Sequence, residues 1–99
     1  MIRHIVTWKL TAGDVPAKSA AFDRLAEAFG VLPRLIPEIK TLHLGRDLDE
    51  TPGNWDVVLI LDVASRADLE AYQVHPEHEK VRLLVRELTA ERSAIDFEL

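Results

Sequence analysis

The chain has 99 residues, of which 47% are hydrophobic and 29% are charged. Both fractions are ordinary for a folded protein, so composition excludes disordered and fibrous classes and the length predicts one domain over residues 1–99. The 17 acidic and 12 basic residues give a formal net charge of −5. Such a charge attracts neither phosphate backbones nor anionic lipids, so we expect no nucleic-acid partner and no membrane partner.

The sequence predicts a cytoplasmic location. Arg3, His4 and Lys9 interrupt what would have to be the apolar core of a signal peptide. The longest apolar run, residues 57–61, has the length of a strand and is far too short for a membrane helix. The chain has no cysteine, which excludes disulfides and a thiolate nucleophile and fits a reducing compartment.

The first third of the chain predicts a strand followed by a helix. In residues 2–10 apolar side chains alternate with Arg3, Thr7 and Lys9, as in a strand with one buried face. Asp14 has the character of an N-cap, and the helix that it opens runs to about residue 29. Its apolar stripe is formed by Phe22, Leu25, Phe29 and Leu32.

The middle of the chain predicts two strands joined by a loop around residues 51–54. Residues 39–48 form the weaker strand, in which Gly45 indicates a bulge. Residues 55–63 form the strongest strand, and their unbroken apolar centre predicts burial on both faces.

The last third predicts two helices and a strand. Ser65 begins a capping box that opens a short helix ending near residue 75, and a second helix begins at Pro76. From residue 93 to 99 apolar and acidic residues alternate, with Asp96 on the polar face of a final strand.

This order of elements predicts a ferredoxin-like α+β fold, βαββαβ, with one antiparallel four-stranded sheet. Helices then cover only one face of the sheet, although two strands carry apolar residues on both faces. An uncovered apolar face marks an interaction surface, and a short chain gains from further burial. We therefore expect a symmetric homodimer in which two sheets pair face to face.

Three polar side chains fall on faces that otherwise belong to the core. His4 lies between Ile2 and Val6, Tyr72 lies one turn after Leu69, and His78 extends the stripe of the last helix into its first turn. The positive end of that helix disfavours an imidazolium, so His78 is expected to be neutral, as a general base must be. His4, Tyr72 and His78 either satisfy one another as a buried hydrogen-bond network or line a wet cavity.

The remaining histidines give weaker evidence for a catalytic or metal site. His75 and His78 have the i, i+3 spacing of a metal pair, but Pro76 separates them and no third ligand follows from the spacing, so we expect no metal. His75 is expected at the helix boundary as an N-cap, and His43 on the solvent side of its strand. Gly-rich phosphate loops and nucleophile elbows are absent, and we expect no cofactor.

Several segments resemble the stress-responsive dimeric A/B barrel (Dabb) proteins. These are the start of the chain, Met-Ile-Arg-His-Ile-Val, the Leu-Gly-Arg of residues 44–46, Trp55-Asp56, and Ala-Tyr-Gln-Val-His-Pro-Glu-His over residues 71–78. The resemblance covers nearly the whole chain and implies a homodimer whose two sheets close into an α+β barrel.

The resemblance also implies a function. One plant member of the family, olivetolic acid cyclase, closes a linear polyketide thioester by an intramolecular aldol condensation. By resemblance, the catalytic residues fall on His78 as base, on Tyr72 as hydrogen-bond donor and on His4 in the pocket. The expected ligand-binding residues are Val6, Trp8, Phe22, Leu59 and His75.

Three functions are therefore open. The first is a homodimer that binds a small organic ligand, with acid–base chemistry of the cyclase type and no cofactor. The second is a non-catalytic stress or interaction protein in which His4, Tyr72 and His78 form a buried network. The third, a monooxygenase without heme or flavin, rests on analogy of fold alone. A cavity of roughly 300 Å³ or more that touches these three side chains would favour the first.

Overall fold

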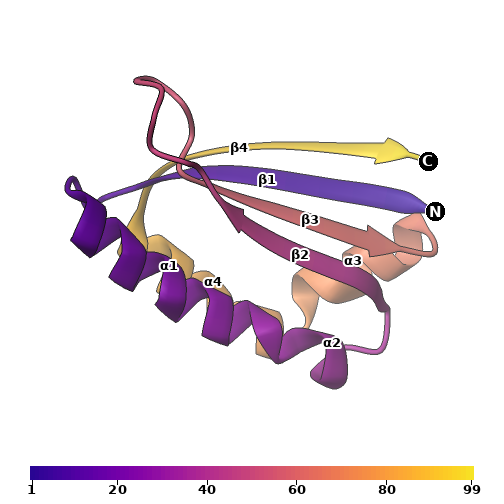
Figure 1. The fold of residues 1–99 in the computed structure, drawn as a ribbon. Helices are drawn as coiled ribbons and strands as arrows, with labels where there is room; N and C mark the ends of the chain where they lie inside the picture. Colours follow the sequence, from indigo (N-terminus) through magenta and orange to yellow (C-terminus); the bar gives the residue numbers. More distant parts are fainter.

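The computed structural model describes residues 1–99 as one sheet with helices on a single face (Figure 1). The strands are β1 (Ile2–Leu10), β2 (Ile39–Arg46), β3 (Val57–Val63) and β4 (Thr89–Glu98). The helices are α1 (Val15–Gly30), α2 (Leu32–Leu35), α3 (Arg66–Val74) and α4 (Pro76–Leu88). Since α2 is a single turn after α1 and α3 runs on into α4, the order follows the predicted βαββαβ pattern.

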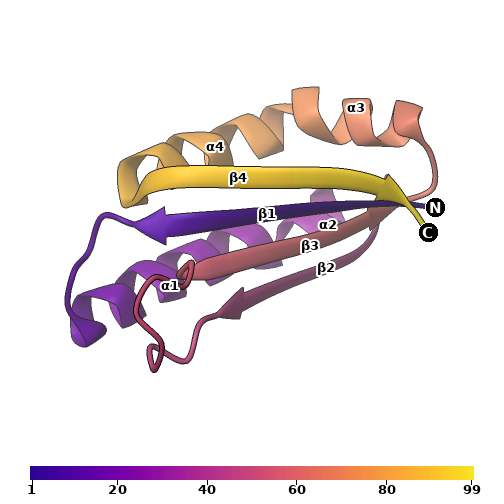
Figure 2. The ribbon, with the colours of Figure 1, turned by 90° about the horizontal axis from the view of Figure 1, so that it is seen from above.

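The sheet has the order β2-β3-β1-β4, and every neighbouring pair is antiparallel. The predicted ferredoxin-like α+β fold with one antiparallel four-stranded sheet is thereby confirmed. In Figure 2 helices α3 and α4 run along the β4 edge of the sheet, whereas α1 crosses behind the central strands. The two helical units therefore cover different parts of the inner face.

Side-chain caps fix where the helices begin. The Asp14 carboxylate accepts a hydrogen bond from the Ala17 amide at 2.8 Å, and the Ser65 hydroxyl accepts one from the Asp68 amide at 3.2 Å. Each cap satisfies an amide that the first turn of a helix leaves unpaired. Both predicted caps are confirmed.

The core lies between the inner face of the sheet and α1, α3 and α4. Strand β1 alternates strictly between buried and half-buried residues, as its sequence predicts. Val6 of β1 and Leu59 of β3 are neighbours in register and are each 1% exposed, and Leu25 of α1 is fully buried. Burial of such side chains is the main favourable contribution to folding.

Three sequence predictions need correction. Gly45 forms no bulge, because it pairs regularly with Val58, and the irregularity lies instead between Ile39 and Thr41. A Cβ at position 45 would lie 3.3 Å from Cγ1 of Val58, so a tight cross-strand contact explains the glycine. The second and third strands are shorter than predicted. Strand β4 begins at Thr89 and not at residue 93, because this strand follows α4 directly and pairs with β1 along almost its whole length.

The outer face of the sheet carries apolar side chains that no helix covers. Ile5 of β1 lies opposite both Ile60 of β3 and Ile95 of β4, which makes a row of three isoleucines across the sheet. Phe97 lies two residues farther along β4, on the same face as Ile95. The predicted burial of β3 on both faces is therefore incomplete in a single chain, where Val58 and Ile60 are half-buried.

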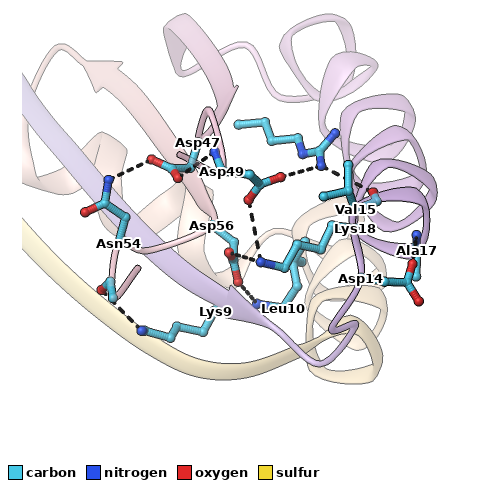
Figure 3. A network of polar contacts seen from close by, with 12 residues as sticks. Lys9, Leu10, Asp14, Val15, Ala17, Lys18, Asp47, Asp49, Asn54 and Asp56 are labelled. Carbon is cyan, nitrogen blue, oxygen red and sulfur yellow. Dashed lines mark hydrogen bonds and ion pairs between the residues drawn. The ribbon is translucent and has the colours of Figure 1, made fainter. Parts of the chain in front are cut away.

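The loop between β2 and β3 is held by ion pairs (Figure 3). The Asp56 carboxylate accepts hydrogen bonds from the Leu10 amide at 2.8 Å and from Nζ of Lys18 at 3.0 Å. Lys18 also lies 3.5 Å from Asp49, which in turn binds Arg46 at 2.7 Å. Asp49 and Asp56 thus each have a cationic partner, and their function is to fasten the loop to α1 and to the end of β1.

None of the helices is both long and apolar enough to cross a membrane.

Candidate functional site

A cavity of about 370 Å³ lies between the sheet and helices α3 and α4. The side chains of His4 from β1, Tyr72 from α3 and His78 from α4 all line it. Its volume lies within the range of about 300–1,000 Å³ that is typical of ligand sites. It is lined by His4, Val6, Trp8, Phe29, Leu59, Tyr72, Gln73, His78, Val81, Arg82, Val85, Arg86, Thr89 and Arg92.

The junction between α3 and α4 brings Tyr72 and His78 together. Pro76 cannot continue α3 but suits the first position of α4, and Nδ1 of His75 accepts a hydrogen bond from the Glu77 amide at 3.1 Å. This predicted N-cap is confirmed. The turn leaves the rings of Tyr72 and His78 only 4.4 Å apart, centroid to centroid.

His78 is held as a neutral base. Its Nδ1 lies 3.2 Å from the backbone carbonyl oxygen of Gln73, and because a carbonyl can only accept, Nδ1 carries the proton. The lone pair is then on Nε2. Burial lowers the pKa of His78 below its usual value, and the positive charge of Arg82 lowers that pKa further. The predicted neutral state thus has burial as its chief cause, and the hydrogen bond to Gln73 only partly opposes it.

Tyr72 is fully buried, and its hydroxyl has no hydrogen-bond partner. Burial strongly raises the pKa of this phenol, so the hydroxyl remains protonated and able to donate. Buried hydroxyls in proteins are normally paired, because an unpaired one costs about 1–3 kcal/mol. An unpaired donor in a cavity wall is therefore a feature that requires explanation.

His4 is fixed by a residue that the sequence analysis did not select. Its Nδ1 lies 2.5 Å from a carboxylate oxygen of Asp96, and the two residues are direct partners across β1 and β4. The imidazole therefore donates to the carboxylate from Nδ1, and its ring stands edge-on to Tyr72 at 6.2 Å. Asp96 was predicted only to lie on a polar face, and the pairing register of the two terminal strands is the signal that identifies it.

The three polar side chains do not satisfy one another. His4 binds Asp96, His78 binds the Gln73 carbonyl, and the Tyr72 hydroxyl binds nothing. Of the two arrangements left open by the sequence, the geometry matches the lined cavity and not the closed network.

The other predicted pocket residues divide into two groups. Val6, Trp8 and Leu59 line the cavity. Trp8 packs against Phe29 with ring centroids 5.9 Å apart, so its indole forms a wall and leaves the cavity open, and its Nε1 is buried without a partner. Phe22 and His75 lie outside the lining, since Phe22 packs against the core and His75 caps α4.

The histidines do not assemble a metal centre. No group of three His, Cys, Asp or Glu side chains lies close enough to hold a metal ion. Nδ1 of His75 is already occupied by the Glu77 amide, and His43 is exposed on the outer face of β2.

Residues 2–99 match the family model of the Stress Responsive A/B Barrel Domain. The chain belongs to the Dabb family. This assignment covers all the elements that form the cavity, and it agrees with the motifs at residues 1–6 and 71–78. No curated protein matches the sequence.

Two solved structures are similar to this Dabb domain in sequence and fold. A dimeric ferredoxin-like protein from Thermobifida fusca is 31% identical, with a TM-score of 0.84 over 99% of this chain and 90% of that one. A dimeric protein of ferredoxin-like fold from Bacteroides fragilis is 28% identical, with a TM-score of 0.86 over 99% of this chain and 95% of that one. The hydroxynitrile lyase of Passiflora edulis is 17% identical, with a TM-score of 0.80 over 97% of this chain and 90% of that one, and shows the shared fold alone.

Replacement of Tyr72 by Phe tests whether the hydroxyl has a structural partner. Because the hydroxyl is buried and unpaired, we expect the free energy of unfolding in urea to rise or to change by less than about 0.5 kcal/mol. Ser65→Ala is the control, since it removes a hydroxyl that is bonded and should cost about 1 kcal/mol. A loss of more than about 1 kcal/mol for Tyr72→Phe would show that the hydroxyl belongs to a structural network.

Proposed function

We propose that this Dabb domain is a homodimer that binds a small organic ligand in the cavity, and that His78 and Tyr72 perform acid–base chemistry on it without a cofactor. The chemistry would resemble the aldol closure carried out by olivetolic acid cyclase-like members. The observation that carries the proposal is the buried, unpaired hydroxyl of Tyr72, whose ring lies 4.4 Å from the neutral imidazole of His78, with both residues in the cavity lining.

The first step would be the removal of a proton from carbon. Nε2 of His78 takes a proton from a methylene next to a carbonyl, and the electron pair of the C–H bond moves to the carbonyl oxygen to form an enolate. Tyr72 donates a hydrogen bond to that oxygen as its charge develops. The elevated pKa of Tyr72 suits this role, because the phenol donates without losing its proton.

The second step would form the new bond. The enolate carbon attacks a second carbonyl of the same ligand, a C–C bond forms, and the resulting alkoxide takes back the proton from the His78 imidazolium. His78 therefore ends neutral, and no electron donor or acceptor is consumed. His4 lines the same cavity and is held by Asp96 through Nδ1, so its Nε2 does not take part in that bond and would position the ligand.

The alternative of a purely structural network has less support. Such a network would pair the buried hydroxyl, because an unpaired polar group lowers stability without a compensating contact. A ligand with a carbonyl oxygen offers the missing acceptor. The same holds for the buried Nε1 of Trp8, which is a second unpaired donor in the cavity wall.

The homodimer is supported by the outer face of the sheet. Ile95 is 60% exposed and Phe97 is 39% exposed, and both extend the isoleucine row of β1 and β3. Contiguous apolar patches of this kind mark interaction sites. The Thermobifida fusca and Bacteroides fragilis relatives are dimeric, and a second copy pairing through the same face would bury the row symmetrically. A cytoplasmic location remains a prediction from the sequence.

His78→Ala tests the base. With acetoacetyl-N-acetylcysteamine as probe, we expect the wild-type chain to accelerate exchange of the acidic methylene protons for deuterium, measured by NMR. His78→Ala should lower the protein-dependent rate at least about 100-fold, and the rate should fall as the pH drops through the lowered pKa of His78, because the imidazolium has no lone pair.

Lys80→Ala is the matched control for that experiment. Lys80 is exposed on α4, the helix that carries His78, and lies outside the cavity, so its removal should leave the exchange rate unchanged. Full activity of His78→Ala, or an equal loss in both variants, would contradict the assignment of the base.

Ile5→Glu tests the dimer. A charge in the middle of the isoleucine row would be desolvated by a partner sheet, so we expect the variant to sediment as a monomer at micromolar concentration while the wild type sediments as a dimer. Leu83→Glu is the control, because Leu83 is 57% exposed on α4, a helix on the opposite face. A monomeric wild type, or a dimeric Ile5→Glu, would overturn the assignment of this face.

A further inference from the structure

The opening of the cavity is cationic, although the chain as a whole is acidic. Three of the 14 lining residues are arginines, namely Arg82, Arg86 and Arg92, and none is Asp or Glu. All three are exposed residues. The formal net charge of the chain is −5, so a cavity lining with three arginines and no carboxylate departs sharply from the composition of the chain.

Two of these arginines have no carboxylate partner. Arg82 lies 3.5 Å from Glu79 and donates to the Gln73 carbonyl at 3.4 Å, whereas Arg86 and Arg92 form no ion pair. Elsewhere in the chain arginines are usually neutralised. Of the five others, four pair with carboxylates, namely Arg3, Arg24, Arg46 and Arg66.

The arginines come from two elements that face each other across the cavity. Arg82 and Arg86 are one turn apart on α4, and Arg92 lies on β4 directly opposite Trp8 of β1. Their field reaches the reacting groups, because the charges of Arg82 and Arg92 both lower the pKa of Tyr72 and so oppose the effect of burial. A negative charge on a bound molecule would meet this field as well.

The inner part of the cavity is apolar. Val6, Leu59 and Phe29 are at most 2% exposed, and all three line the cavity. The lining therefore separates into a buried apolar wall and an exposed cationic rim. A molecule that satisfies both parts has an apolar body and one anionic end.

We propose that the ligand of this site is an organic anion, with its apolar body in the cavity and an anionic oxygen head group, a carboxylate or a phosphate, held by Arg86 and Arg92. This inference rests on the proposed ligand-binding function and names the class of its substrate. Guanidinium groups bind both head groups through paired N–H donors. Binding of the head group at the rim orients the ligand, so that its carbonyl carbons lie toward Tyr72 and His78.

The test compares an anionic and a neutral molecule with the same apolar body, 4-butylbenzoate and 4-butylbenzamide, by calorimetry with the full chain. At low salt we expect the benzoate to bind at least about tenfold more tightly than the benzamide. We expect this difference in affinity to shrink at about 1 M salt, because charges are then screened over a distance of about 3 Å. A third compound, 4-butylphenyl phosphate, distinguishes the head groups, since the tighter of the two anions identifies the one that the rim prefers.

Two variants locate the effect. Arg86→Gln with Arg92→Gln should weaken benzoate about tenfold and change benzamide less than about twofold. Arg34→Gln is the matched control, because Arg34 is also exposed and without an ion pair but lies on α2, outside the cavity, and should change neither. Thermal unfolding of the double variant verifies that it is folded.

The outcomes separate the two proposals. Equal binding of benzoate and benzamide would overturn the proposal that the ligand is an anion. If Val85→Trp in the cavity wall then abolished binding of both compounds, and Leu83→Trp on the solvent side of α4 did not, the proposed ligand-binding cavity would stand. Equal weakening of both compounds by the double arginine variant would also overturn it. If none of the compounds bound, both the proposed ligand-binding function and the proposed anionic class of the ligand would be overturned.

Discussion

The site depends on the hydroxyl of Tyr72, which is buried completely and bonded to nothing. Folding usually avoids such a group, because removal from water is costly when no protein partner replaces the lost hydrogen bond. Here the surrounding core tolerates it. The Tyr72 ring lies 4.4 Å from the ring of His78, and both residues line a cavity of about 370 Å³, in which a ligand atom would complete the hydrogen bonding of the hydroxyl.

The fold places this group through short-range features. Pro76 ends α3 and begins α4, and the His75 cap sets the angle at which α4 departs. The same turn exposes the Gln73 carbonyl to Nδ1 of His78, which fixes the tautomer and leaves Nε2 free. The motif Tyr-x-x-His-Pro-x-His therefore supplies both the turn between α3 and α4 and the two side chains that this turn brings together.

Features with local causes could be predicted from the sequence. Caps, helix starts and the alternation of β1 depend on neighbours within a few residues, so Asp14, Ser65 and the inward side of His4 were identified correctly. Features that depend on strand pairing could not. The contact of His4 with Asp96, the regular pairing of Gly45 and the arginines around the cavity follow from which residues face each other across the sheet or between α4 and β4. A single sequence does not state that register.

The two faces of the sheet have different functions. The inner face holds the cavity and its polar groups, and the outer face carries the isoleucine row that a second copy would cover. Association with a second copy would bury this apolar surface, and a chain of 99 residues gains stability from such additional burial. Association through the outer face would leave the cavity between the sheet and the helices intact in each subunit.

Long-range proton–nitrogen NMR of the His78 imidazole is the most direct test of its role as the base, because the spectrum reports both the tautomer and the pKa of the ring. We expect a neutral ring at about pH 7, with the proton on Nδ1 and a pKa below the usual value near 6.5. A ring that is charged at about pH 7, or that carries its proton on Nε2, would contradict the role of His78 as base. In either form Nε2 is protonated and has no lone pair with which to take a proton from carbon.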